Sequence, residues 1–307
     1  MMKVGLEQID VYVYNAVRLT ISALVLVIFA LFERRRGVLP LPGIRRRQII
    51  VYALMVCALY QLLFLLGIAK TTSGNTALII ATVPMWTALL ARFALGETLR
   101  VIAWCGLVVA LIGTVIVAMQ KGDVTTAKEH LIGNLIILTA ALVWAIGTVY
   151  SRPLLKKISP LQLAATASMI ALPIHILFGV RQFSANLQAL KSFDLWLILL
   201  YSGVLSSGLA QPMWHFGVRR AGAAHAAIIQ NLIPLVAIVA AWLSRGESAT
   251  APQIIGGTLI LAGLVTMRAG RNNGKQDASN RCEQKASQQE SISVVKREAN
   301  GEKLITR

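Results

Sequence analysis

The chain has 307 residues, of which 56% are hydrophobic and 14% charged, and its formal net charge is +17. Apolar runs of about 20 residues recur along it, each long enough to cross the hydrocarbon core of a bilayer. This composition excludes a water-soluble domain, whose surface helices would carry polar faces. The basic residues lie in loops and in the tail, where they suit anionic headgroups, so a nucleic-acid partner is also excluded. We predict an all-α, polytopic membrane protein embedded in the lipid bilayer.

Nine membrane-spanning segments are predicted, in chain order. They cover residues 11–32, 48–68, 74–94, 101–119, 131–151, 160–180, 195–215, 222–243 and 252–268. The tail that follows, 269–307, is polar and poor in aromatics, and we expect it to be disordered. Most of the 30 Lys and Arg residues fall in one set of alternate loops. The positive-inside rule places that set in the cytoplasm, together with the C-terminus, and Met1 outside.

Residues 67–118 recur 150 positions later, at 217–268, without a gap. The matched positions include a proline, a Gly-Glu pair and two glycines seven residues apart: Pro84 with Pro234, Gly96 and Glu97 with Gly246 and Glu247, Gly106 with Gly256, and Gly113 with Gly263. The loop assignment gives the two copies opposite orientations in the membrane. An inverted repeat of this kind is typical of carriers that bind a substrate near the midplane, between the halves.

The repeat also predicts that the first half is one helix short. At the same offset, the segment 131–151 would correspond to residues upstream of Met1, so the second half has five predicted spans and the first has four. We expect that a tenth, N-terminal span belongs to the ancestral fold and is absent here, either through a misplaced start or through a real truncation.

The candidates for a substrate site are prolines, amides and one aromatic residue inside the spans. Pro84 and Pro234 should kink or break their helices, either to line a cavity or only to improve packing. The expected substrate contacts are Gln61, Asn75, Trp144, Gln211, Gln230 and Asn231. Gln61 and Gln211 occupy matched positions of the repeat. The alternative for the amides is an interhelical hydrogen bond, and for Trp144 a place in the bundle core.

Arg18 needs an explanation, because a charge in the first third of a span is costly. The favoured interpretation is that it snorkels to the headgroups or pairs with a carboxylate such as Glu7 or Asp10; the alternative is that it holds an anionic substrate. Trp214, near the end of its span, could be an interface anchor. His175 is the weakest candidate and could be a core histidine with its hydrogen bonds satisfied.

Glycines recur at seven-residue spacing in two spans, Gly106 with Gly113 and Gly256 with Gly263, and Gly257 lies beside Gly256. Small residues let membrane helices approach closely. We interpret these positions as packing seams, where the chain could also form a homodimer.

No catalytic pattern is found in the sequence. There is no arrangement of Ser, His and Asp that can be argued, no metal-binding pair of histidines and no phosphate-binding loop, so we predict that the chain is not an enzyme and needs no metal or cofactor. The acidic residues lie at span ends or in loops. This disfavours a proton relay through a buried carboxylate and leaves a histidine relay open.

At these residues the sequence resembles the EamA-like branch of the drug/metabolite transporter superfamily. The resemblance rests on the Arg-containing AVRLTISALVLVIF, on GNTALIIATVPMWTALLARFALGE and its counterpart AAHAAIIQNLIPLVAIVAAWLSRGE, and on LIGNLIILTAALVWAIGTVYSR. It implies ten helices in two inverted repeats of five, both termini in the cytoplasm, and transport of small metabolites. Residues 1–125 would form the first repeat, 126–268 the second, and 269–307 a disordered cytoplasmic tail.

The sequence therefore predicts a secondary transporter of small metabolites, such as amino acids or related solutes, in the plasma (inner) membrane. It would act as an exporter, by alternating access at a site between the repeats. The alternative is a membrane subunit or receptor that transports nothing and acts through its basic C-terminal tail.

Overall fold

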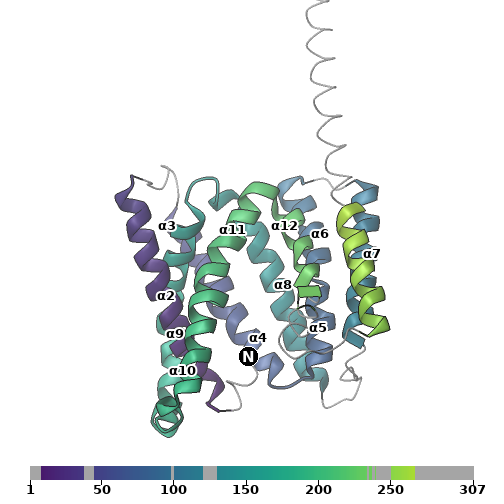
Figure 1. The fold of residues 1–307 in the computed structure, drawn as a ribbon. Helices are drawn as coiled ribbons and strands as arrows, with labels where there is room; N and C mark the ends of the chain where they lie inside the picture. Colours follow the sequence, from purple (N-terminus) through teal and green to yellow (C-terminus); the bar gives the residue numbers. More distant parts are fainter. Residues whose placement is uncertain are drawn as a thin grey trace, which may run out of the picture.

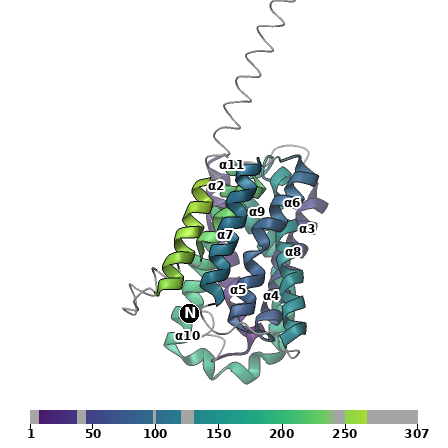
Figure 2. The ribbon, with the colours of Figure 1, turned by 90° about the vertical axis from the view of Figure 1, so that its right-hand side faces the viewer.

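The structure, a computed structural model, describes residues 8–37, 45–97, 100–119, 130–233, 235–236, 239 and 250–266. Within these ranges every regular element is a helix, and the helices stand side by side in one bundle (Figures 1 and 2). Seven of them are long and apolar enough to cross a membrane, and the shorter Ala251–Thr266 is also apolar. The all-α membrane fold is confirmed. The predicted span 222–243 lies partly outside the described residues, so the count of nine stays a prediction.

The first half contains four long helical segments. Helix α2 (Val11–Arg35) is capped by Asp10, whose Oδ1 accepts a hydrogen bond from the backbone N–H of Tyr12 at 2.9 Å. The second segment is continuous through α3 (Arg46–Tyr52), the π-helical η1 (Ala53–Tyr60) and α4 (Gln61–Ile68). Helices α5 (Ser73–Ala81) and α6 (Val83–Leu95) form the third, and α7 (Val101–Met119) is the fourth.

The second half begins with the long helices α8 (Leu131–Leu154) and α9 (Pro160–Phe183). Two 3-10 turns, Ser184–Asn186 and Ala189–Lys191, lead to α10 (Phe193–Leu200), the π-helical η5 (Tyr201–Leu209) and α11 (Ala210–Ala221). Helix α12 (Ala223–Ile228) then passes into the 3-10 turn η6 (Ile229–Leu232). The two halves interlock, because α2 of the first half packs along α9 of the second (Figure 1).

The third segment breaks where the sequence predicts a kink. Helix α5 ends at Ala81, Thr82 forms a turn, and α6 begins at Val83 with Pro84 in its first turn. Proline fits the start of a helix because its missing N–H would have no intrahelical acceptor there. Pro84 itself is buried, so it shapes the segment and does not face open space. The matched Pro234 lies outside the described residues.

A close seam joins α7 to the C-terminal helix Ala251–Thr266, and the two lie side by side in both ribbon views (Figures 1 and 2). A Cβ added to Gly113 would lie 2.5 Å from the carbonyl oxygen of Gly256, and one added to Gly256 would lie 2.6 Å from that of Gly113. Gly263 approaches the carbonyl oxygen of Gly106 in the same way. These glycines therefore serve as a packing seam within the chain, as the sequence predicts.

Both π-helical segments precede a glutamine. Gln61 is the first residue of α4, directly after η1, and Gln211 is the second residue of α11, just after η5. A π-helical turn widens the helix and is often found at functional sites. The two wide turns lie about 150 positions apart, as do the two glutamines.

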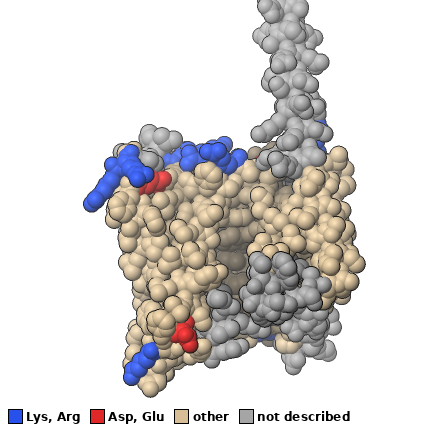
Figure 3. Space-filling view, in the orientation of Figure 1, with Lys and Arg blue, Asp and Glu red and all other residues tan. Residues whose placement is uncertain are grey.

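On the face shown in Figure 3, most of the Lys and Arg side chains lie at the end of the bundle where α2 and α11 finish. Arg34 and Arg35 occupy the last turn of α2, and Arg219 and Arg220 the last turn of α11. We refer to this end as the basic end.

Candidate functional site

A cavity of about 570 Å³ lies inside the bundle, and side chains from both halves line it. Its walls come from α2, η1 and α4 of the first half and from α8, α9, η5, α11 and η6 of the second. Figure 3 shows a hollow near the middle of the face that carries α11. This volume falls within the range of small-molecule sites.

Four of the six predicted substrate contacts line this cavity. They are Gln61, Trp144, Gln211 and Gln230, and Arg18 lies with them. Asn75 and Asn231 are not among the lining residues. Arg18 and Gln230, which are 212 positions apart in the sequence, therefore line the same cavity.

Arg18 is buried in the cavity wall at 5% exposure and does not snorkel to the headgroups. One of its terminal nitrogens donates to Asn15 Oδ1 at 2.7 Å and to Gln61 Oε1 at 3.2 Å. No carboxylate among the described residues, Asp10 included, lies within ion-pair distance of it, and its Nε has no hydrogen-bond partner there. Glu7, the other carboxylate named for it, lies outside the described residues.

His175 holds this network in place. Because a guanidinium only donates, Asn15 turns Oδ1 toward Arg18 and offers its amide N–H to His175 Nδ1, at 3.1 Å. His175 Nε2 then donates to the backbone oxygen of Cys57 at 2.7 Å, in the π-helical η1. Both ring nitrogens are thus occupied in the neutral form. His175, the weakest candidate in the sequence, therefore links α9 to α2 and η1 beside the cavity.

A wall of aromatic rings forms another side of the cavity. The Tyr60 and Trp144 ring centroids are 4.8 Å apart, those of Trp144 and Trp214 are 5.7 Å apart, and Phe64 stacks on Tyr60 at 5.8 Å. Trp144 Nε1 is buried without a partner among the described residues. Trp144 is thus both a packing residue and a cavity residue, and Trp214 faces the cavity and is no interface anchor.

Gln211 and Gln230 differ in how many of their amide atoms have a hydrogen-bond partner. Gln211 receives a long hydrogen bond from Ser168, at 3.4 Å, and its Nε2 lies 3.6 Å from Cys57 Sγ. Gln230 Oε1 is buried with no partner among the described residues. A buried amide oxygen without a donor costs free energy, so this atom is ready to accept a hydrogen bond from a bound solute.

Asn75 has a structural position. Its Nδ2 donates to Asn134 Oδ1 at 3.2 Å, and Thr71 Oγ1 donates to the same oxygen at 2.5 Å. Its backbone N–H is bonded to Thr72 Oγ1, the cap of α5. These bonds fasten the start of α5 to α8. The alternative of an interhelical hydrogen bond is the one that this geometry fits.

Asn231 lies in η6, next to Gln230, at 2% exposure. Its Nδ2 has no partner among the described residues. It therefore stands behind the cavity wall, and a direct contact with a solute stays a prediction.

Polar contacts join the two halves at the basic end. Glu97, just after α6, forms an ion pair with Arg152 of α8 at 3.4 Å. Its carboxylate also accepts the backbone N–H groups of Ala223 and Ala224, both at 3.2 Å, at the first turn of α12. Arg152 in turn donates to the backbone oxygen of Arg219 at 2.6 Å. One carboxylate of the first half thereby contacts α8 and α12 of the second, and Arg152 extends the link to α11.

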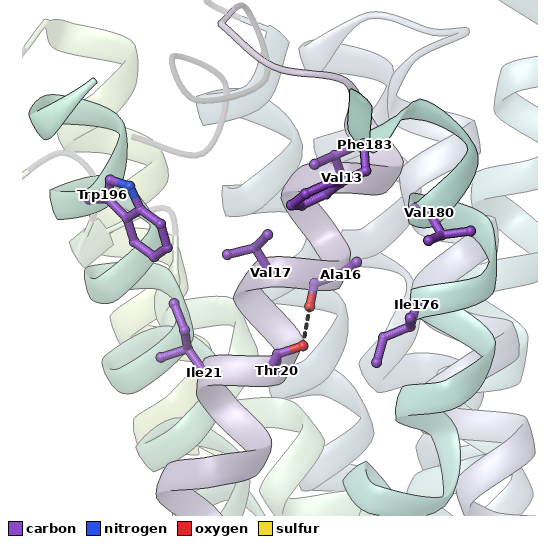
Figure 4. Close-up of a pocket in the computed structure, with 10 residues that line it drawn as sticks. Val13, Ala16, Val17, Thr20, Ile21, Ile176, Val180, Phe183 and Trp196 are labelled. Carbon is purple, nitrogen blue, oxygen red and sulfur yellow. Dashed lines mark hydrogen bonds between the residues drawn. The ribbon is translucent and has the colours of Figure 1, made fainter. Parts of the chain in front are cut away.

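A second cavity, of about 370 Å³, lies between α2, α9 and α10 and is lined by apolar side chains (Figure 4). Its one hydroxyl, on Thr20, donates to the backbone oxygen of Ala16 at 2.8 Å, and Trp196 Nε1 is bonded to the backbone oxygen of Leu190. Val180 in its wall is 60% exposed. With no free polar group on its walls, this space offers nothing to orient a polar solute.

The sequence profile of the EamA-like transporter family matches residues 1–119 and 131–269. The chain belongs to the EamA-like transporter family. EamA-like relatives include the uncharacterized transporter YoaV of Bacillus subtilis, which is 27% identical over 86% of this chain and 89% of its own length. A probable terminal-alkyne amino-acid exporter of Streptantibioticus cattleyicolor is 26% identical over 90% of each chain.

One solved crystal structure has a similar fold, with a TM-score of 0.74 at 17% identity over 88% of this chain and 93% of that one. The family match and the relatives named as transporters, together with the apolar helices, show that the chain is a multi-pass transporter-type membrane protein and not an enzyme. A small-molecule substrate and a bilayer environment follow from the same relatives.

Several lining residues are absent from the predicted set: Tyr60, Phe64, Ser168, Ser206, Ser207 and Trp214. The 150-residue offset relates several of them to other lining residues: it pairs Arg18 with Ser168, Phe64 with Trp214, Cys57 with Ser207 and Tyr60 with Ala210. The offset alone does not identify them, because which side of a helix faces a cavity is decided by packing.

Proposed function

We propose that this chain is a secondary transporter that moves small metabolites, amino acids or related solutes, out of the cell by alternating access. The observation that carries the proposal is the 570 Å³ cavity whose walls come from both halves of the chain. A carrier must expose one site to each side in turn, and a site between two halves can do so when the halves rock against each other.

The Glu97 contacts support this mechanism, because they join the halves at the basic end through a few polar bonds. Such bonds can be broken and remade in each cycle. By the positive-inside rule the basic end faces the cytoplasm. The described conformation is then closed toward the cytoplasm, and the transport cycle requires the Glu97 contacts to open.

Two observations support the inverted repeat that alternating access would use. In the glycine seam, Gly113 contacts Gly256, and Gly106 contacts Gly263. The repeat matches Gly106 with Gly256 and Gly113 with Gly263. Each glycine of α7 therefore contacts the repeat counterpart of the other glycine of α7. The π-helical segments η1 and η5 come before matched glutamines. A pseudo-twofold axis between the halves would produce both. We further propose residues 1–125 and 126–268 as the two repeats, in the plasma membrane, with residues 269–307 on the cytoplasmic side.

The amino-acid part of the proposal is supported by the name of one relative, the probable terminal-alkyne amino-acid exporter. The test is a counterflow assay on the purified full chain in proteoliposomes, with amino acids, nucleosides, sugar phosphates and organic cations as separate panels. Exchange confined to the amino-acid panel is the expected result. Exchange of another class alone would refute the substrate assignment, and no exchange by monodisperse protein would contradict transport itself.

A further inference from the structure

We propose that Arg18 is the anion-binding residue of the central cavity, and that the cavity takes an organic monocarboxylate with an apolar, ring-sized body. This inference rests on the proposed function and names the substrate class of the same site. It makes the carboxylate, and not a positive or neutral group, the feature that the protein recognises.

The first step is that Arg18 is a buried charge without a counter-ion among the described residues. The described carboxylates have other roles: Asp10 caps α2, Glu33 accepts a hydrogen bond from Ser159, and Glu97 pairs with Arg152. Asp194 lies in the first turn of α10. An unpaired guanidinium in the interior of a membrane protein is costly, and such residues face a cavity and mark the path of a substrate.

The second step is that Arg18 is held in place with part of its fork left open. Asn15 and Gln61 accept from one terminal nitrogen, and His175 fixes Asn15 from across the boundary between the halves. These acceptors are neutral, so they orient the guanidinium without cancelling its charge. The buried Nε stays without a partner in the described part of the chain. A carboxylate could occupy the open side with the charge-assisted hydrogen bonds that arginine forms best.

The third step concerns the rest of the lining. Arg18 is the one Lys, Arg, Asp or Glu among the lining residues that the structure describes, so the wall carries a single positive charge. A phosphate ester, with two negative charges, would leave one of them unmatched, and an organic cation would be repelled. The rings of Tyr60, Trp144 and Trp214 provide a surface for an apolar body. Gln230 Oε1 can accept from a second polar group of the solute, such as an amine.

The test is a binding measurement on the purified full chain in detergent, followed by tryptophan fluorescence, since Trp144 and Trp214 line the cavity. The probes are 3-phenylpropanoate, its neutral amide and 3-phenylpropylamine, which share one ring and one chain length. We expect the carboxylate to bind at least about tenfold more tightly than the amide, and the amine not to bind, because a hydrogen bond to a charged group is worth about one further order of magnitude in affinity.

Arg18→Gln should bring the affinity for the carboxylate down to that of the amide and leave the amide unchanged. Arg18→Lys keeps the charge without the fork and should retain part of the preference. The matched control is Arg181→Gln, in the last turn of α9 and outside the cavity lining, which should behave as wild type. If Arg18→Gln does not give monodisperse protein, Arg18→Lys and the preference of the wild type decide the question.

Equal binding of carboxylate and amide by the wild type would overturn the inference. The inference would also be overturned if sodium chloride alone produced the same fluorescence change as the carboxylate and this change depended on Arg18. The site would then bind inorganic anions. Counterflow separates this inference from the proposed function. Carboxylate binding that depends on Arg18 without any exchange keeps the site and refutes transport. Exchange of amines that Arg18→Gln leaves unchanged keeps transport and refutes the anion site.

Discussion

Replacing Glu97 with glutamine should open the cavity toward the basic end. Glu97 is the carboxylate through which the first half reaches α8 and α12, by the ion pair with Arg152 and the hydrogen bonds from Ala223 and Ala224. Glutamine has nearly the same shape but no charge. It has one accepting oxygen where the carboxylate has two, so it can serve only one of the two backbone N–H groups well.

The magnitude follows from these three contacts. The side chains of Arg152 and Glu97 are 24% and 21% exposed, so the ion pair contributes up to about 1 kcal/mol. A negative charge at the first turn of a helix contributes about 0.3–1 kcal/mol. One lost backbone hydrogen bond costs about 0.5–1.5 kcal/mol. Together, about 1–3.5 kcal/mol would be removed from the closed conformation, and its ratio to the open one would fall by about 5- to 300-fold.

Cys57 provides the assay, because it lines the cavity and is buried in the closed conformation. In a background with Cys105 and Cys282 replaced by serine, a membrane-impermeant thiol reagent is applied to inside-out vesicles, which present the cytoplasmic side. Glu97→Gln should raise the rate of Cys57 modification from that side. Asp194→Asn is the matched control, since it also changes an acid to its amide but lies at the opposite end, in α10 (Figure 1).

An unchanged rate of Cys57 modification from the cytoplasmic side, with the protein still folded, would refute this reasoning. A rise seen equally with Asp194→Asn would also refute it, because the effect would then reflect general loosening of the bundle. A rise from the opposite side would mean that the Glu97 contacts keep the cavity closed at that end and not at the basic end.

Three further predictions concern the glycine seam, the hydrogen bond between Asn75 and Asn134, and Asn231 behind the cavity wall. Gly113→Ala should destabilise the protein by about 1–3 kcal/mol through overpacking against the C-terminal helix; thermal unfolding in detergent measures it, and Gly217→Ala, whose Cβ meets nothing within 4 Å, should be neutral. Asn75→Ala should cost about 1 kcal/mol of stability by releasing α5 from α8, with the KM for transport unchanged; a raised KM at unchanged stability would make it a substrate contact. Asn231→Ala should slow counterflow without reducing membrane insertion, since it disturbs the turn that carries Gln230; unchanged kinetics would argue against its place in the site.

The sequence could predict the fold class, because spans are set by the local balance between apolar side chains and the bilayer. It could also predict Gln61 and Gln211, because the repeat offset relates the two positions. Asn75 shows where such reasoning ends. A buried amide in a span needs a partner, but nothing local says whether that partner is a solute or, as here, Asn134 on another helix.

Arg18 shows a second limit. Its position in the first third of a span allows snorkelling, and only the packing of α2 against α9 decides that it points inward. The π-helical segments are a third case. Neither Ala53–Tyr60 nor Tyr201–Leu209 contains a residue that demands a wide turn. Their geometry comes from tertiary contacts and, in η1, presents the backbone oxygen of Cys57 to His175.

The substrate site and the closure at the basic end are joined by one short stretch of chain. Glu97 caps the first turn of α12 at Ala223 and Ala224, and the chain runs from there to Gln230 in the cavity wall within seven residues. We expect a movement that releases Glu97 to act directly on the segment that carries Gln230. At the other side of the cavity, Arg18 is tied to the second half through Asn15 and His175. A solute held between Arg18 and Gln230 would thus contact both halves at once, and its binding would bear directly on whether the Glu97 contacts stay closed.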